Sequence, residues 1–127
     1  MNPLTIEWIE KAEGDILTAQ REYRARIRPN YDAVCFHSQQ TAEKYLKAWL
    51  QESGKDIPRI HNLVELVSLC LEIDPTFSIL EPELRGLDSY AVRTRYPGQN
   101  ADKDEAKTAL KISKGIRLFI RKKLSLE

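Results

Sequence analysis

The hydrophobic and polar positions of this chain repeat with the period of an α-helix, most clearly between residues 35 and 50. This stretch contains neither glycine nor proline and is rich in residues that favour helices. Its apolar residues fall on one broad side: Phe36, Ala42, Tyr45, Leu46, Trp49 and Leu50. Its polar residues form a narrow stripe on the other side: His37, Gln40, Lys44 and Lys47. The pattern predicts a helix whose apolar side lies in the core and whose polar stripe needs a separate explanation.

The same period predicts that this helix runs from Tyr31 or Asp32 to Glu52 and that two other long helices flank it. The first begins near Asn2-Pro3, or at a Thr5 cap, and carries one apolar stripe: Ile9, Ala12, Ile16, Ala19 and Tyr23. A basic run closes it, at the end where cations complement the helix dipole: Arg21, Arg24, Arg26 and Arg28. The last helix begins around Ala101 or Asp102 and continues to about residue 123.

Two shorter helices are predicted between the second and the last. One opens at His61-Asn62 and ends at Asp74-Pro75, with four residues on its buried side: Leu63, Leu66, Val67 and Cys70. The other spans residues 80–90, and residues 91–100 after it are the least helix-like segment of the chain. No segment shows the alternation typical of a strand. The sequence therefore predicts an all-α fold.

Long amphipathic helices joined by short connections favour an up-and-down antiparallel bundle, here of four to five helices in one domain over residues 1–127. The stripes contain many alanines, which permit close approach between helices: Ala12, Ala19, Ala42, Ala48 and Ala109. Alanine also supplies less apolar volume than leucine. We therefore expect a homodimer, in which a further face of each bundle is buried.

Composition narrows the classes of function. An apolar share of 42% and a charged share of 31% are typical of a globular protein, and a net charge of +1 requires any nucleic-acid site to be a local patch. Cys35 and Cys70 are expected to be reduced core residues. No metal-ligand spacing, glycine-rich phosphate loop or long apolar run occurs. We expect a cytoplasmic protein without a metal, a cofactor or a membrane span.

Three features are candidates for chemistry. The polar stripe of the second helix offers an imidazole, an amide and two ammonium groups to a phosphate or a base, or is simply a solvated face. In the 91–100 segment, Arg93 and Arg95 are suited to binding phosphate while Tyr96 stacks on a base. Alternatively, one arginine pairs with a carboxylate of the bundle and Tyr96 packs as a plug. His61, at a helix start, is either a ligand or a capping residue.

Three motifs, in order along nearly the whole chain, resemble those of the HEPN domain family. Residues 35–48, Cys-Phe-His-Ser-Gln-Gln-Thr-Ala-Glu-Lys-Tyr-Leu-Lys-Ala, resemble the second helix of that family. Residues 59–63, Arg-Ile-His-Asn-Leu, are similar to its step into the third helix. Residues 93–98, Arg-Thr-Arg-Tyr-Pro-Gly, are similar to its Thr-Arg-Tyr-Pro element before the last helix.

The resemblance implies a helical bundle that forms a homodimer, often as the partner of a minimal nucleotidyltransferase in a toxin–antitoxin-like pair. Other branches are metal-independent ribonucleases with an Arg followed four to six residues later by His. This chain departs from that signature, because Arg59 precedes His61 by two positions and Arg28 precedes His37 by nine. No catalytic residue can therefore be assigned from the motif.

Three hypotheses follow from these observations. In the first, a nucleotide or RNA is held by Arg93, Arg95 and Tyr96, with His37, Gln40, Lys44, Lys47 and His61 near the same groove. In the second, a ribonuclease uses His37 or His61 as acid or base beside an arginine. In the third, the chain is a structural partner subunit without a ligand. The first predicts that the polar stripe lies close to the 93–98 loop, within one subunit or across the dimer.

Overall fold

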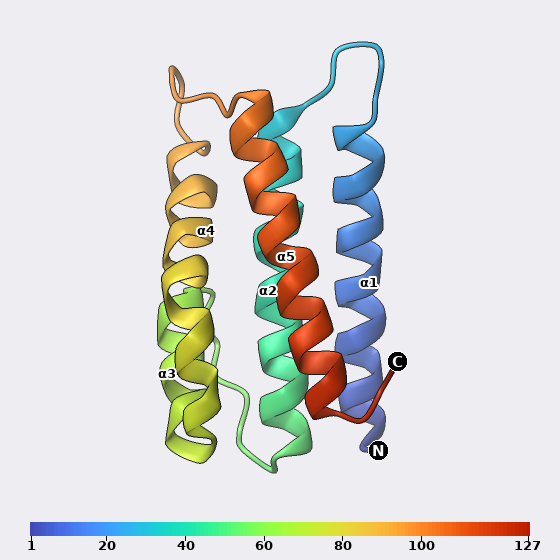
Figure 1. Ribbon diagram of the computed structural model, residues 1–127, viewed down its shortest axis with the longest axis vertical. Helices are drawn as coiled ribbons and strands as arrows, with labels where there is room; N and C mark the ends of the chain where they lie inside the picture. Colours follow the sequence, from blue (N-terminus) through green and yellow to red (C-terminus); the bar gives the residue numbers. More distant parts are fainter.

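The computed structural model describes residues 1–127 and contains only helices (Figure 1). Their bounds are α1 Pro3–Tyr23, α2 Tyr31–Glu52, α3 Leu63–Ile73, the 3-10 helix η1 Pro75–Leu80, α4 Glu81–Arg93 and α5 Lys103–Lys123. The long helices lie side by side along the molecule, and α3 packs beside one half of α4. The predicted all-α bundle is confirmed. None of these helices combines the length and hydrophobicity needed to cross a bilayer.

Polar side chains set the helix boundaries. The side chains of Asn2, Asn30, Asn62 and Asp102 each accept a backbone N–H at the start of α1, α2, α3 and α5. At α5 the cap is reciprocal, because the Glu105 side chain also accepts the N–H of Asp102 at 3.1 Å. These caps explain why the predicted starts of the long helices lie within a residue or two of the observed ones.

The region before the last helix differs from the prediction in two ways. Residues 75–80 form η1, which the sequence pattern did not indicate and which the Asp74 side chain caps. In addition, α4 continues to Arg93, so Ala91 to Arg93 are helical although they belong to the segment predicted to be least helix-like. Ala91 is buried in the bundle, and the first proline after it is Pro97, which restricts only Tyr96.

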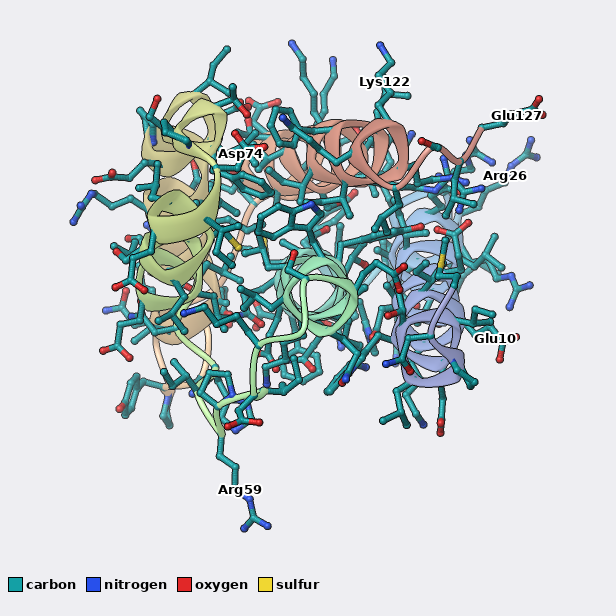
Figure 2. All side chains as sticks on the ribbon, turned by 90° about the horizontal axis from the view of Figure 1, so that it is seen from below. Glu10, Arg26, Arg59, Asp74, Lys122 and Glu127 are labelled. Atoms are coloured by element: carbon teal, nitrogen blue, oxygen red, sulfur yellow. The ribbon has the colours of Figure 1, made fainter.

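The second helix, α2, is the central element of the bundle. It packs against α1, α3, α4 and α5, and Figure 2 shows it seen end-on between them. Because of this position, 13 of its 22 residues are buried. They include the polar residues Ser38, Gln39, Thr41, Glu43 and Lys47. The helix is therefore buried on more sides than its apolar pattern predicts.

Phe36 lies differently from the prediction. Its place in the apolar pattern predicts a core position, but Phe36 is 42% exposed. Its ring makes an edge-to-face contact with the ring of His37, and the two ring centres are 5.2 Å apart. The core is instead completed by Phe77 of η1. The centre of its ring lies 4.5 Å from the ring centre of Trp49 and 5.1 Å from that of Phe119. Phe36 is thus an apolar residue of α2 that does not belong to the core.

Both cysteines are buried and unpaired, as expected of core residues. Cys35 lies on α2 and Cys70 on α3. Burial in apolar surroundings disfavours the thiolate, and it raises the pKa of Cys35 to about 11 and that of Cys70 to about 12. Both side chains therefore act as small apolar residues at neutral pH.

A group of three side chains joins α1, α2 and α5. Arg117 donates two hydrogen bonds to the Glu13 carboxylate, at 2.7 and 2.8 Å, and the Tyr45 hydroxyl donates a third at 2.6 Å. The bidentate arginine lowers the pKa of Glu13, with a smaller contribution from Tyr45. Burial raises the pKa of Tyr45 to about 12, so the hydroxyl stays a donor.

The lowered pKa of Glu13 makes the contribution of this ion pair depend on pH. A carboxyl group with a lower pKa in the folded than in the unfolded state stabilises the fold above its ordinary pKa, and this stabilisation is lost as the pH falls through the folded value. Glu13→Gln should therefore lower the free energy of unfolding at neutral pH, with the difference shrinking at acid pH. Urea unfolding across this pH range measures it. Glu10→Gln, on the exposed side of α1, should show no such trend.

Candidate functional site

Two residues of the predicted stripe, His37 and Lys44, face α1. Asp15 Oδ1 lies 2.8 Å from His37 Nδ1, and Asp15 Oδ2 forms an ion pair with Lys44 Nζ. The Asp15 side chain is only 11% exposed, whereas His37 and Lys44 keep 28% and 22%. One carboxylate thus serves both side chains across the α1–α2 interface. This part of the stripe is a partly accessible helix contact rather than a solvated face.

Lys47, the last residue of the stripe, is buried. Its Nζ donates to Glu43 Oε2 at 3.1 Å and sits 5.5 Å from the ring centre of Trp8 on α1. The Glu43 and Lys47 side chains are 4% and 5% exposed, and His61 Nδ1 lies 3.1 Å from the same Glu43 oxygen. Glu43 Oε1 has no partner within the chain. Lys47 therefore holds a buried ion pair and is not on an accessible face, contrary to the prediction from spacing.

Gln40 belongs to a network that joins α2, α3 and α4. Its Nε2 donates to Gln39 Oε1 at 3.0 Å, and Gln39 Nε2 donates to the carbonyl of His61 at 2.8 Å. Asp88 of α4 accepts the backbone N–H groups of Leu63 and Val64 at 2.7 and 3.3 Å. Burial raises the pKa of Asp88, an effect that these hydrogen bonds oppose. The network fixes the start of α3, which follows the connection over residues 53–62.

The third predicted group lies at the junction of α4 and α5. Arg93 forms an ion pair with Glu105 of α5 and lies 5.6 Å from the ring centre of Tyr90. Arg95 is exposed, its side chain makes no hydrogen bond or ion pair, and Tyr96 is 63% exposed. The predicted pairing of an arginine with a bundle carboxylate therefore occurs at Arg93, whereas Tyr96 is exposed and does not pack as a plug. Arg95 and Tyr96 are the residues here that can meet a ligand.

The predicted site residues do not form one cluster within a single chain. His37 and Lys44 lie between α1 and α2; Gln40, Lys47 and His61 lie where α2 meets the start of α3; Arg93, Arg95 and Tyr96 lie between α4 and α5. No hydrogen bond or ion pair joins the loop to the stripe, and each histidine contacts a carboxylate rather than an arginine. A shared groove across a dimer stays a prediction.

A polar hollow of about 320 Å³ lies near the loop. It is lined by residues 28–32 from the end of the α1–α2 connection and the start of α2, and by Asn100 and Ala101 from the connection before α5. The α1–α2 and α4–α5 connections lie at the same end of the bundle (Figure 1). The basic residues Arg26 and Arg28 therefore share this end with Arg93 and Arg95. The sequence pattern did not predict that these two connections lie at the same end of the bundle.

Three acidic residues of the site escaped prediction: Asp15, Glu43 and Asp88. Asp15 and Asp88 pair with α2 residues that are 22 and 49 positions away. Contacts over such separations leave no local pattern in the sequence from which they could be predicted. Glu43 was detectable, because it precedes Lys47 by four residues and this spacing favours an ion pair on a helix. The burial of Glu43 was not detectable from the sequence, because it depends on packing against α1 and on the connection that contains His61.

The fold and these motifs define an all-α module of a known class. The family model described as HEPN domain matches residues 5–123, so this chain belongs to the HEPN domain family. Its structure is similar to that of TT1696 from Thermus thermophilus, with a TM-score of 0.78, 26% identity and coverage of 97% of this chain and 99% of the other. It also shares its fold with ST0689, an archaeal HEPN homologue, with a TM-score of 0.76, 24% identity and coverage of 94% and 96%. No curated protein matches the chain.

The buried Glu43–Lys47 pair supplies a test of the site's architecture. Lys47→Met should destabilise the protein by about 3–5 kcal/mol, because it leaves the Glu43 charge buried with only the exposed His61 ring beside it. The double variant Glu43→Gln with Lys47→Met removes both charges and should recover much of this loss. Denaturant unfolding of the wild type, Lys47→Met, Glu43→Gln and the double variant measures the coupling energy between the two side chains. Strictly additive losses would show that the two charges do not depend on each other.

Proposed function

We propose that this HEPN domain is a nucleotide- or RNA-binding module whose ligand contacts come from the loop between α4 and α5. The observation that carries the proposal is the contrast between neighbours in this loop. Arg93 is held by Glu105, while Arg95 and Tyr96 are exposed and the fold makes no use of their side chains. A free guanidinium beside a free aromatic ring supplies both contacts that a nucleotide needs.

The fold supports this role by holding both ends of the loop. Glu105 accepts the Asp102 N–H with one carboxylate oxygen and pairs with Arg93 through the other, so the loop is tied to the start of α5. Loops positioned by a rigid bundle commonly carry binding residues. The hollow beside Arg28 and Asn100 adds polar surface at the same end of the bundle. Arg28 in this hollow is a further cation at the same end of the bundle as Arg95.

Arg95→Ala and Tyr96→Ala should each weaken binding of ATP or a short RNA. Loss of aromatic stacking costs about 1–3 kcal/mol per base, which corresponds to a roughly 5- to 150-fold rise in Kd. Fluorescence titration measures the change, and circular dichroism checks the fold. Arg85→Ala removes an exposed arginine from the middle of α4 and should leave the Kd unchanged. Unchanged affinity in both loop variants would exclude this loop as the site.

The proposal includes an assembly. The chain acts as a homodimer in the cytoplasm and as the partner subunit of a minimal nucleotidyltransferase in a toxin–antitoxin-like pair. The Arg-Thr-Arg-Tyr-Pro element supports the second part, through its resemblance to the branch of the family that has such partners. The exposed ring of Phe36 supports the first, because it is an apolar side chain on the central helix that the single chain leaves 42% exposed.

Light scattering after size-exclusion chromatography tests the assembly. The chain alone should have twice its monomer mass of 14.7 kDa, and Phe36→Gln should shift it toward the monomer. Leu118→Gln is the matched control, because Leu118 is an exposed apolar residue of α5. Co-expression with a minimal nucleotidyltransferase should give one complex containing both chains. A monomeric wild type would contradict the dimer, and separate elution would contradict the partnership.

A further inference from the structure

The outer face of α5 carries a row of five lysines: Lys103, Lys107, Lys111, Lys114 and Lys122. At four-, four-, three- and eight-residue spacings they occupy roughly a third of the helix circumference. All five are exposed, and none forms an ion pair within the chain. We call this row the lysine ridge. Figure 2 shows Lys122 pointing away from the bundle.

The other basic residues of α5 are used differently. Arg117 pairs with Glu13 of α1, and Lys123 pairs with Asp74 beside η1. Arg121 donates to the carbonyl of Glu127 and to the hydroxyl of Tyr45. The ridge itself includes one acidic neighbour, Asp104 at its first turn, and one apolar residue, the exposed Leu118. Like charges three or four residues apart destabilise a helix, so the ridge works against the stability of α5. In a chain with a net charge of only +1, it concentrates unneutralised cations on one face.

We infer that the lysine ridge binds the phosphodiester backbone of a nucleic-acid strand that continues from the loop between α4 and α5 along α5. The inference rests on the proposed function and specifies its ligand as a strand rather than a free nucleotide. The ridge begins at the end of the bundle where Arg93 and Arg95 lie, because Arg93 pairs with Glu105 in the first turn of α5. The loop and the ridge therefore adjoin at the start of α5, where the exposed carboxylates of Asp102 and Asp104 lie between Arg95 and Lys107 in the sequence.

The dimensions of the ridge favour an extended polyanion. The distance along the helix from Lys103 to Lys122 is about 29 Å at the helical rise of about 1.5 Å per residue. A mononucleotide covers only a small part of this length, whereas a strand places one phosphate after another along it. An anionic membrane is a poorer fit, because the apolar side of α5, with Ile112, Ile116 and Ile120, is buried in the core and cannot insert.

The test compares two triple variants by fluorescence anisotropy. One removes three ridge charges, Lys107→Gln, Lys111→Gln and Lys114→Gln. The control removes three charges elsewhere, Lys55→Gln, Arg59→Gln and Arg85→Gln; Arg59 lies on the opposite side of the molecule from Lys122 (Figure 2). The probes are single-stranded RNA and DNA of about a dozen nucleotides, within the site sizes known for strand-binding domains, and a dinucleotide.

The ridge variant should bind the dozen-nucleotide strands at least about tenfold more weakly at low salt, and its slope of log affinity against log salt should be shallower by about 2. The control variant should lose much less, and dinucleotide binding should be unchanged in both. Because like-charge repulsion is removed, the ridge variant should melt no lower than the wild type. An unchanged affinity for the long strands, or equal losses in the two variants, would overturn the inference.

Three further outcomes separate this inference from its alternatives. If poly-glutamate competes for the ridge as well as RNA does, the surface binds acidic protein and the strand assignment is wrong. If long strands bind through the ridge while Arg95→Ala leaves dinucleotide binding unchanged, the loop assignment fails and the ridge stands. If the dinucleotide binds through the loop but long strands gain no affinity over it, the ridge fails and the proposed function stands.

Discussion

The burial of α2 on several sides at once is the constraint on which this structure depends. A helix in that position must bury polar residues along with apolar ones, and each buried polar group costs free energy unless it has a hydrogen-bond or ion-pair partner. Glu43 and Lys47 pair with each other, Gln39 contacts α4 and the chain before α3, and Tyr45 donates to Glu13 of α1. The partners of α2 thereby determine how its neighbours are placed. The polar residues of this helix hold the bundle together as much as its apolar residues do.

The same constraint separates the charges of the molecule into two kinds. Inner charges such as Asp15, Lys44 and Glu13 are engaged in contacts between helices and are only partly accessible. The lysines on the outer face of α5, and Arg95 at the α4–α5 connection, have no partner that the fold requires. The polar stripe on α2 is therefore mainly a set of contacts between helices. The proposed ligand contacts are instead Arg95, Tyr96 and the lysine ridge, which are exposed.

Local pattern was sufficient for most of the fold because helix formation is itself local. Asparagine and aspartate caps and the period of apolar residues marked α1, α2, α3 and α5 closely. It failed where packing overrides local preference. Phe77 reaches the core from a 3-10 turn that no pattern indicated, and Phe36 stays exposed although its helical position resembles that of a core residue. Lys47 lies against Trp8 of α1, and its partner Glu43 contacts His61; both Trp8 and His61 are distant from Lys47 in sequence.

The sequence by itself determined the all-α class, the helix boundaries to within a few residues, the HEPN resemblance and the set of polar residues from which a site could be built. Each depends on neighbours within a few positions or on motifs taken in order. Only the tertiary structure decided which of those residues the fold itself uses. Asp15 and Asp88 contact α2 residues from 22 or more positions away, and Glu105 holds Arg93 while Arg95 remains free. Pairing between distant residues is a property of packing, and no local period encodes it.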